Sequence, residues 1–100
     1  MPQSLIRYRT KPDQAAANEE LVRAVYAELH RTRPDGFRYA TLMLDDQVTF
    51  VHIVQSEHDP SPILAVKAFS EFQAGIMDRC DEPPAQQTFT EIGSYRSLTR

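Results

Sequence analysis

The 100-residue sequence contains no tryptophan, one cysteine and only three glycines. Because Cys80 has no second cysteine to pair with, the fold cannot contain an internal disulfide, and we expect a reducing, cytoplasmic location. The three glycines are too scattered to form a phosphate-binding loop. We therefore expect no nucleotide, and no other cofactor.

Long apolar runs and an excess of basic residues are also absent. No stretch approaches the roughly 20 apolar residues that cross a bilayer. Eleven Lys plus Arg against fourteen Asp plus Glu give a net charge of −3, which disfavours binding to nucleic acid phosphates or to an anionic membrane. The charged, alternating N-terminal residues, MPQSLIRYRT, do not resemble a signal peptide. We expect neither a nucleic acid nor a membrane partner.

The apolar content of 41% is enough for one core, and we expect residues 1–100 to form a single domain. Segments in which every second residue is apolar, typical of strands, alternate with segments in which apolar residues recur about every 3.6 residues, typical of helices. We expect the chain to be interrupted at Pro12, at Pro34–Gly36 and at Pro83–Pro84. This pattern predicts strands over residues 5–11, 37–44, 48–55 and 86–96, the last with a bulge at Gly93, and helices over residues 13–31 and 63–80.

The order βαββαβ predicts an α+β fold, a ferredoxin-like sandwich whose antiparallel sheet has strand order 4-1-3-2 and both helices on one face. Residues two apart in a strand share a face. We expect the face toward the helices to carry Ile6, Tyr8, Ala40, Leu42, Leu44, Val51 and Ile53. The other face would carry Arg7, Arg9, Tyr39, Thr41, Met43, Phe50, His52 and Val54.

That second face is too apolar for a monomer. Phe37, Tyr39, Met43, Phe50 and Val54 would form a contiguous patch in water, which monomeric proteins usually avoid. We expect a homodimer in which two sheets pack face to face as an α+β barrel and enclose a small-molecule cavity. The interface should exceed the roughly 1,600 Å² of a standard complex.

Several segments resemble a known protein group. They are Arg7–Pro12 (RYRTKP), Glu19–Leu29 (EELVRAVYAEL), Gly36–Thr41 (GFRYAT), Thr49–Val54 (TFVHIV), Arg79–Pro84 (RCDEPP) and Gly93–Arg96 (GSYR). Together they resemble the antibiotic biosynthesis monooxygenase-like group, within the dimeric α+β barrel superfamily. The resemblance implies that fold, a homodimer and a family of reactions that includes cofactor-independent oxygenases, haem-degrading enzymes, lactone isomerases and polyketide cyclases.

Two differences between this sequence and that group restrict the reactions that we expect. The haem degraders and the best-studied cofactor-free oxygenases of the group use a pocket tryptophan, which this chain lacks. The haem degraders also carry an iron-ligating histidine on the second helix, and residues 63–80 contain none. We expect that the protein is not a haem-degrading enzyme.

The candidate catalytic residues are His52, Arg7 and Tyr39, which the predicted pairing brings together in the cavity. His52 would act as a general base or polarise a ketone or phenol, and Arg7 would bind a carboxylate or enolate. The alternative is structural: His52 would hydrogen-bond to neighbouring side chains, and the arginines would pair with Glu91. Candidate ligand-binding residues are Arg9, Thr41, Met43, Phe50, Phe69 and Phe72.

Other reactive side chains are better explained without a site. Glu57, His58 and Asp59 are consecutive and cannot easily turn toward one ion, so we expect a solvated loop and no metal. Cys80 ends an apolar helical stripe and is expected to be a core residue. Tyr95 would either donate a proton or pack at the cavity edge.

Two functions of different class remain. The first is a cofactor-independent monooxygenase-like protein, or a related isomerase, acting on an aromatic or polyketide-like small molecule in a cavity that excludes water. The second is a non-catalytic dimer that binds a small molecule. The absent tryptophan disfavours the first, and the Arg, His and Tyr side chains disfavour a purely apolar binder.

Overall fold

The computed structural model describes residues 3–59 and 61–96. The strands are β1 (Gln3–Thr10), β2 (Phe37–Met43), β3 (Thr49–Ser56) and β4 (Cys80–Thr88). A 3-10 turn, η1 (Pro12–Gln14), leads into α1 (Ala15–Thr32), and η2 (Pro62–Ala65), α2 (Lys67–Ala74) and α3 (Ile76–Arg79) join β3 to β4. Within the described ranges no helix is both long and apolar enough to cross a membrane.

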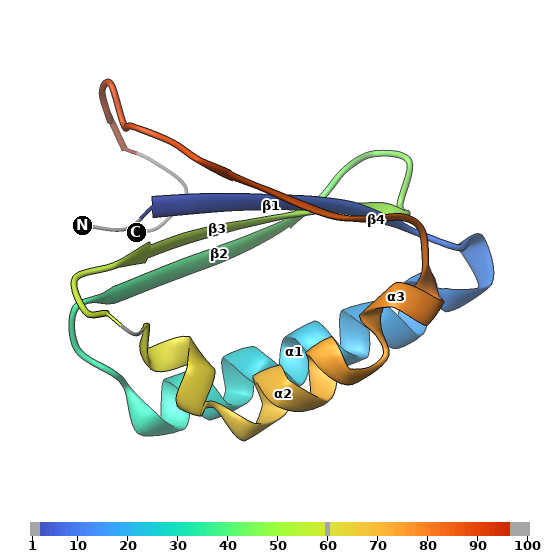
Figure 1. Cartoon of the computed structure of the whole chain (residues 1–100), viewed down its shortest axis with the longest axis horizontal. Coiled ribbons are helices and arrows are strands. Elements are labelled where there is room, and N and C mark those ends of the chain that lie inside the picture. The colour runs from blue at the N-terminus through green and yellow to red at the C-terminus, as the bar shows by residue number, and fades with distance from the viewer. Residues whose placement is uncertain (1–2, 60, 97–100) are drawn as a thin grey trace.

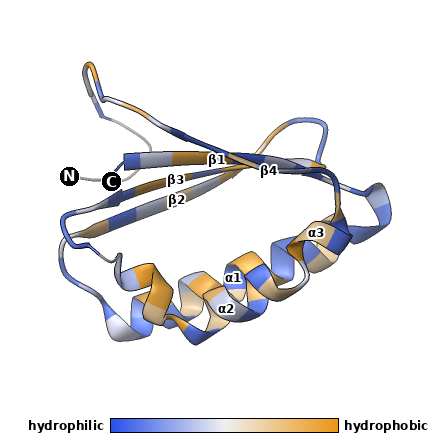
Figure 2. Ribbon diagram, viewed as in Figure 1, coloured by the Kyte–Doolittle hydropathy of each residue, from blue (hydrophilic) through white to orange (hydrophobic). Residues whose placement is uncertain are grey.

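The four strands form one antiparallel sheet in the order β2-β3-β1-β4. All helices lie on the same face of this sheet, and the other face is open (Figure 1). The α+β class, the ferredoxin-like arrangement and the strand order predicted from the sequence are confirmed. Apolar and polar residues alternate along α1 and α2, as expected for helices that each bury one side (Figure 2).

The predicted faces of β2 and β3 are wrong. Ile6 of β1 pairs with His52 of β3, and His52 pairs with Thr41 of β2, so these three side chains share a face. That face is toward the helices, because the His52 ring lies 5.4 Å from the ring of Phe72 on α2. The residues moved to the helix side are Tyr39, Thr41, Met43, Phe50, His52 and Val54; those moved to the open face are Ala40, Leu42, Val51 and Ile53.

The physical reason is that both faces of β2 and β3 are apolar enough to be buried. A shift of one residue in register exchanges the two faces of a strand, and only a contrast between them fixes the choice. β1 has that contrast, since Arg7 and Arg9 alternate with Ile6 and Tyr8, and its faces were predicted correctly.

The second predicted helix is interrupted twice. Val66 is extended, with φ −82° and ψ 116°, and a new helix begins after it. The Glu28 carboxylate of α1 accepts hydrogen bonds from the backbone N–H groups of Lys67 and Ala68, at 3.1 and 2.9 Å, and so caps α2. Those hydrogen bonds, led by the one from Ala68, lower the pKa of Glu28. Gly75 then separates α2 from α3.

The last strand lies earlier than predicted, at residues 80–88 in place of 86–96. Pro83 and Pro84, expected to break the chain, lie inside β4, where the pairing with β1 shifts register twice. Proline is tolerated there because β4 is an edge strand with bulges. Gly93 therefore lies beyond the strand, next to Ile92, whose side chain is 95% exposed.

The core lies between the sheet and the helices. Its centre is the Tyr8 ring, which stacks on Phe50 with ring centroids 5.5 Å apart and contacts Phe72 at 6.2 Å. The buried apolar residues are Tyr8, Val22, Val25, Phe50, Ile63, Val66, Phe72 and Cys80. The same layer contains buried polar side chains, which are part of the site described below.

The β2–β3 turn combines a good cap with a strained residue. Asp46 accepts hydrogen bonds from the Thr49 hydroxyl and from the N–H groups of Val48 and Thr49, and these lower its pKa. Gln47 has φ 64°, in the left-handed region that favours glycine.

Replacement of this strained residue, Gln47→Gly, should raise the free energy of unfolding by about 0.5 to 1 kcal/mol, because the relief of strain exceeds the entropy that glycine adds to the unfolded chain. Chemical denaturation measures it. The control Asp45→Gly, in the same turn without positive φ, should lower stability. An equal loss in both variants would contradict the assignment of strain to Gln47.

Candidate active site

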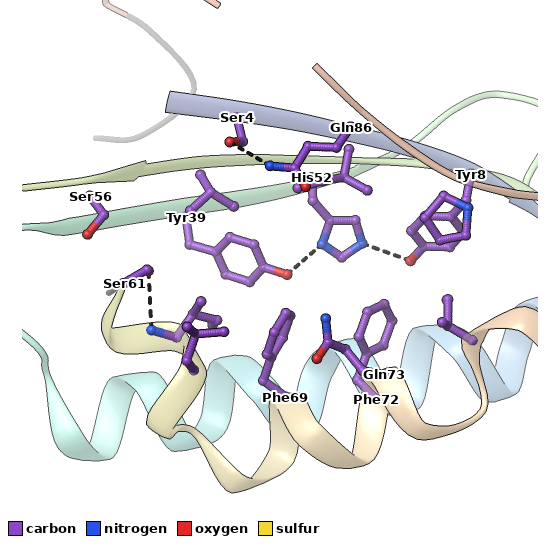
Figure 3. Close-up of a pocket in the computed structure, with 16 residues that line it drawn as sticks. Ser4, Tyr8, Tyr39, His52, Ser56, Ser61, Phe69, Phe72, Gln73 and Gln86 are labelled. Carbon is purple, nitrogen blue, oxygen red and sulfur yellow. Dashed lines mark hydrogen bonds between the residues drawn. The ribbon is translucent and has the colours of Figure 1, made fainter. Parts of the chain in front are cut away.

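A cavity of about 370 Å³ lies between the sheet and the helical segments that follow β3. Its inner wall is the buried face of β1 and β3, and its outer wall is α2 with η2 (Figure 3). The lining residues are Ser4, Ile6, Tyr8, Tyr39, His52, Val54, Ser56, Ser61, Ile63, Leu64, Phe69, Phe72, Gln73, Ile76, Pro84 and Gln86. This cavity lies within one chain, and apart from Tyr8 its most buried ionisable lining residue is His52.

His52 is hydrogen-bonded at both ring nitrogens. The Tyr39 hydroxyl lies 2.5 Å from Nδ1, and the Tyr8 hydroxyl lies 2.7 Å from Nε2 (Figure 3). These three residues come from β2, β3 and β1, and the sheet register brings them side by side. The rings also pack, since the His52 centroid is 5.3 Å from Tyr8 and 5.6 Å from Tyr39. The imidazole is therefore held in one orientation.

The hydrogen bonds continue from Tyr8 into the helices. Asn18 of α1 donates from Nδ2 to the Tyr8 hydroxyl at 2.9 Å, and Arg79 of α3 donates from Nε to Asn18 Oδ1 at 3.1 Å. Asn18 is fully buried and Arg79 is 8% exposed. We call Arg79, Asn18, Tyr8, His52 and Tyr39 the polar chain.

Arg79 has further partners that stabilise its buried charge. Its Nη2 donates to the backbone carbonyl of Phe72 at 2.6 Å, in the last turn of α2, where a cation is favourable. The guanidinium also lies 5.3 Å from the centre of the Phe72 ring. Gly75 leaves room for it, because a Cβ at that position would stand 3.1 Å from Arg79 Nη1. The helix break at Gly75 therefore serves the polar chain.

Burial decides the charge state of the site. Desolvation lowers the pKa of His52 to about 4, so the imidazole is neutral at pH 7. Desolvation also raises the pKa of Tyr8 and of Tyr39, and the hydrogen bond from Asn18 partly offsets this effect at Tyr8. Both phenols keep their protons. The site therefore offers neutral hydrogen-bonding groups, and His52 is a weak base there.

A side branch joins the polar chain at His52. The Thr41 hydroxyl lies 3.2 Å from His52 Nδ1 and 2.8 Å from the Tyr26 hydroxyl of α1. The Tyr26 ring stacks on Tyr39, with centroids 5.2 Å apart. These contacts fix the Tyr39 ring against α1 and aim its hydroxyl at His52.

The structure brings four of the sequence-predicted residues together. Tyr39, His52, Phe69 and Phe72 all line the cavity. Thr41 lies one hydrogen bond away, in a separate hollow that it shares with Met43 and Phe50.

The other predicted site residues lie elsewhere. Arg7 is exposed and pairs with Val51, which places it on the open face, away from His52 and Tyr39. Arg9 forms an ion pair of 3.0 Å with Glu82 on β4, in place of the expected Glu91. The prediction of one cluster containing Arg7, Tyr39 and His52 is therefore wrong, because it assumed the opposite faces for β2 and β3.

The remaining candidates have structural positions. Met43 is 47% exposed, and Phe50 is packed in the core against Tyr8. Cys80 is buried, and burial raises the pKa of its thiol. Tyr95 is 83% exposed. In residues 3–59 and 61–96, no group of three or more His, Cys, Asp or Glu side chains is placed to hold a metal ion.

Known structures share this architecture. A candidate antibiotic biosynthesis monooxygenase from Nitrosomonas europaea matches with a TM-score of 0.76 and 18% identity, over 93% of this chain and 100% of that one. SnoaB, a cofactor-independent oxygenase from Streptomyces nogalater, matches with a TM-score of 0.67 and 20% identity, over 96% and 97%. The chain has the antibiotic biosynthesis monooxygenase-like fold.

A protein whose function is not known shares the same fold. A protein of unknown function from Nitrosomonas europaea matches with a TM-score of 0.69 and 17% identity, over 98% of this chain and 96% of that one. No family model and no curated protein sequence matches the chain. The resemblance is thus confirmed for the monooxygenase-like fold, and an argument for activity must come from the site.

Sequence reasoning missed Asn18 and Arg79. A signal for both was present, because each lies on an apolar helical stripe: Asn18 is four residues before Val22, and Arg79 is seven residues after Phe72. A polar residue on a buried stripe requires a polar partner in the facing layer. The sheet residues able to supply one were Tyr8, Tyr39 and His52.

The low pKa of His52 predicts a specific acid sensitivity. Between pH 6.5 and pH 4 the unfolded chain binds a proton at this residue and the native protein does not, so acidification favours unfolding. This contribution is fully present above pH 6.5, and roughly 3 kcal/mol is lost by pH 4. Urea unfolding across this pH range should show the loss in the wild type and not in His52→Gln.

The matched control is His30→Gln, on the exposed surface of α1. It should follow the wild-type pH profile. The same pH dependence in wild type and His52→Gln would mean that His52 is not buried as a neutral imidazole.

Proposed function

We propose that the protein is a cofactor-independent monooxygenase-like enzyme that acts on an aromatic or polyketide-like ketone or phenol in this cavity. The observation that carries the proposal is a largely apolar cavity with a hydrogen-bonded pair, Tyr39 and His52, in its wall. Its volume of about 370 Å³ lies in the usual range for small-molecule sites, and aromatic side chains form its walls. The likeness in fold to SnoaB supports the same reaction class.

The charge state of the site restricts the substrate. His52 is a weak base, and within the described residues no Asp, Glu, Lys or Arg lines the cavity. The substrate must therefore ionise readily by itself. The Tyr39 hydroxyl, hydrogen-bonded to His52, would stabilise the resulting oxyanion by donating a hydrogen bond, which a low-dielectric site strengthens. An anthrone or an electron-rich phenol has this property.

Such a reaction needs no reductant. An anthrone loses a proton from its methylene carbon, and the resulting carbanion gives electrons to dioxygen. A carbon–oxygen bond forms, the oxygen–oxygen bond breaks, and the methylene becomes a carbonyl while the second oxygen atom leaves as water. The carbon loses four electrons and dioxygen gains four. The protein's part is to bind the ring system, exclude water and stabilise the oxyanion.

We propose in addition that the working form is a homodimer built on the open sheet face. That face carries a half-buried apolar row, Leu5, Ala40, Leu42, Val51 and Ile53, in place of the residues expected from the sequence. A second sheet of the same kind would cover it. The exposed Ile92 and Tyr95, beyond β4, are further apolar surface available to a partner.

A binding protein without catalysis is the second candidate. It is favoured by the absence of a strong base and of a charged group from the described cavity lining. Such a protein would hold the same ligands, because recognition depends on the same aromatic walls and the Tyr39 hydroxyl.

Oxygen consumption with anthrone separates the two. The wild type should form anthraquinone whose new oxygen comes from isotopically labelled dioxygen, with water as the other product. Tyr39→Phe removes the oxyanion donor and should lower kcat/KM by about 100-fold. His30→Gln should retain full activity. Tight binding of anthrone without oxygen consumption would reject the enzyme and leave the binding protein.

Analytical ultracentrifugation tests the dimer. The wild type should sediment at twice the 11.4 kDa chain mass at micromolar concentration. Val51→Asp puts a charge at the centre of the open face and should give monomers, since an unpaired buried charge is costly. Ser70→Asp, on the exposed surface of α2, should remain dimeric. A wild-type monomer would contradict the proposal.

A further inference from the structure

We propose that Arg79 and Asn18 set the direction of every hydrogen bond in the polar chain, so that Tyr39 presents its hydroxyl proton to the cavity and selects ligands that carry an oxygen acceptor. Arg79 and Asn18 are positioning residues in this account, because neither lines the cavity. The ligand class rests on the proposed function above, whereas the direction of the chain can be measured without any ligand.

The direction begins at Arg79, because a guanidinium can only donate. Its Nε donates to Asn18, so the amide must turn its oxygen toward Arg79 and its Nδ2 toward Tyr8. The Tyr8 oxygen then accepts from Asn18. Its own proton remains for the other neighbour within hydrogen-bond distance, Nε2 of His52 at 2.7 Å.

The direction then passes through the imidazole. His52 is neutral and carries one ring proton. With Nε2 accepting from Tyr8, that proton is on Nδ1, which faces the Tyr39 oxygen at 2.5 Å. The reverse arrangement would leave the buried Tyr8 proton without an acceptor, and an unpaired buried donor is costly. None of the described buried side-chain nitrogen or oxygen atoms lacks a partner.

Tyr39 is the end of the chain. Its oxygen accepts from His52, and no other hydrogen bond of this hydroxyl is found in the described residues. The Tyr39 proton is therefore available to a molecule in the cavity that it lines. Hydrogen bonds arranged in one direction polarise one another, which makes this hydroxyl a stronger donor. A ketone, quinone or phenolate oxygen fits it, and a ligand that can only donate does not.

The tautomer of His52 is the direct test. Nitrogen-15 NMR of the ligand-free protein distinguishes a protonated ring nitrogen from an unprotonated one. In the wild type we expect the proton on Nδ1. Asn18→Asp replaces a donor by a carboxylate that can only accept and still pairs with Arg79, so Tyr8 should donate to it and the His52 proton should move to Nε2.

Gln14→Glu is the matched control, because it adds the same charge four residues earlier, in η1, at a residue that is not part of the polar chain. It should leave the proton on Nδ1. A purely structural role of Asn18 would lower the melting temperature of Asn18→Asp without moving the proton. A proton on Nε2 in the wild type, or on Nδ1 in Asn18→Asp, would overturn the proposal.

Ligand selection is tested with 1-acetonaphthone and its hydrocarbon isostere 1-isopropenylnaphthalene. The wild type should bind the ketone about tenfold more tightly, the value of one neutral hydrogen bond, and Asn18→Asp should lose the preference. Equal affinities in the wild type would overturn the donor role of Tyr39. If neither compound binds, the proposed function fails, while the tautomer measurement still decides the direction of the chain.

Discussion

The buried hydrogen bond between Arg79 and Asn18 is the constraint on which the rest of this structure depends. A guanidinium in the interior is tolerated only with partners for its donors, and here those partners are an amide oxygen and the carbonyl of Phe72. To provide them, the helix breaks at Gly75, and Asn18 takes a position on the core stripe of α1. The amide then needs an acceptor from the sheet, which is Tyr8, and Tyr8 in turn needs His52.

The polar chain also explains why a cavity is present beside the close-packed core. Tyr8, His52 and Tyr39 are held in place beside the cavity by hydrogen bonds and ring contacts. Ordinary apolar packing would fill such a space, because protein interiors are close-packed. The network thus links stability to function, because the side chains that would contact a ligand are also buried polar groups that need hydrogen-bond partners in the folded protein.

The fold could be predicted from the sequence, but not which residues of β2 and β3 face the helices. The element order and the contrast of Arg7 and Arg9 with Ile6 and Tyr8 determine the topology and the orientation of β1. β2 and β3 lack such a contrast, because both of their faces are apolar. His52 and Tyr39 were therefore predicted on the correct strands but on the opposite face of the sheet. The break at Val66 depends on Glu28, and the break at Gly75 makes room for Arg79, whose partner is Asn18; both Glu28 and Asn18 lie far away in the sequence. The edge position that tolerates Pro83 and Pro84 is likewise known only once the sheet is assembled.

The central claim is that His52 lies between the sheet and the helices, within the polar chain. Nuclear Overhauser effects from its ring protons test this most directly. We predict contacts to the rings of Phe72 and Tyr8, whose centroids lie 5.4 and 5.3 Å away. Contacts from the His52 ring to the side chain of Arg7, without any to Phe72, would place the imidazole on the open face and contradict the account.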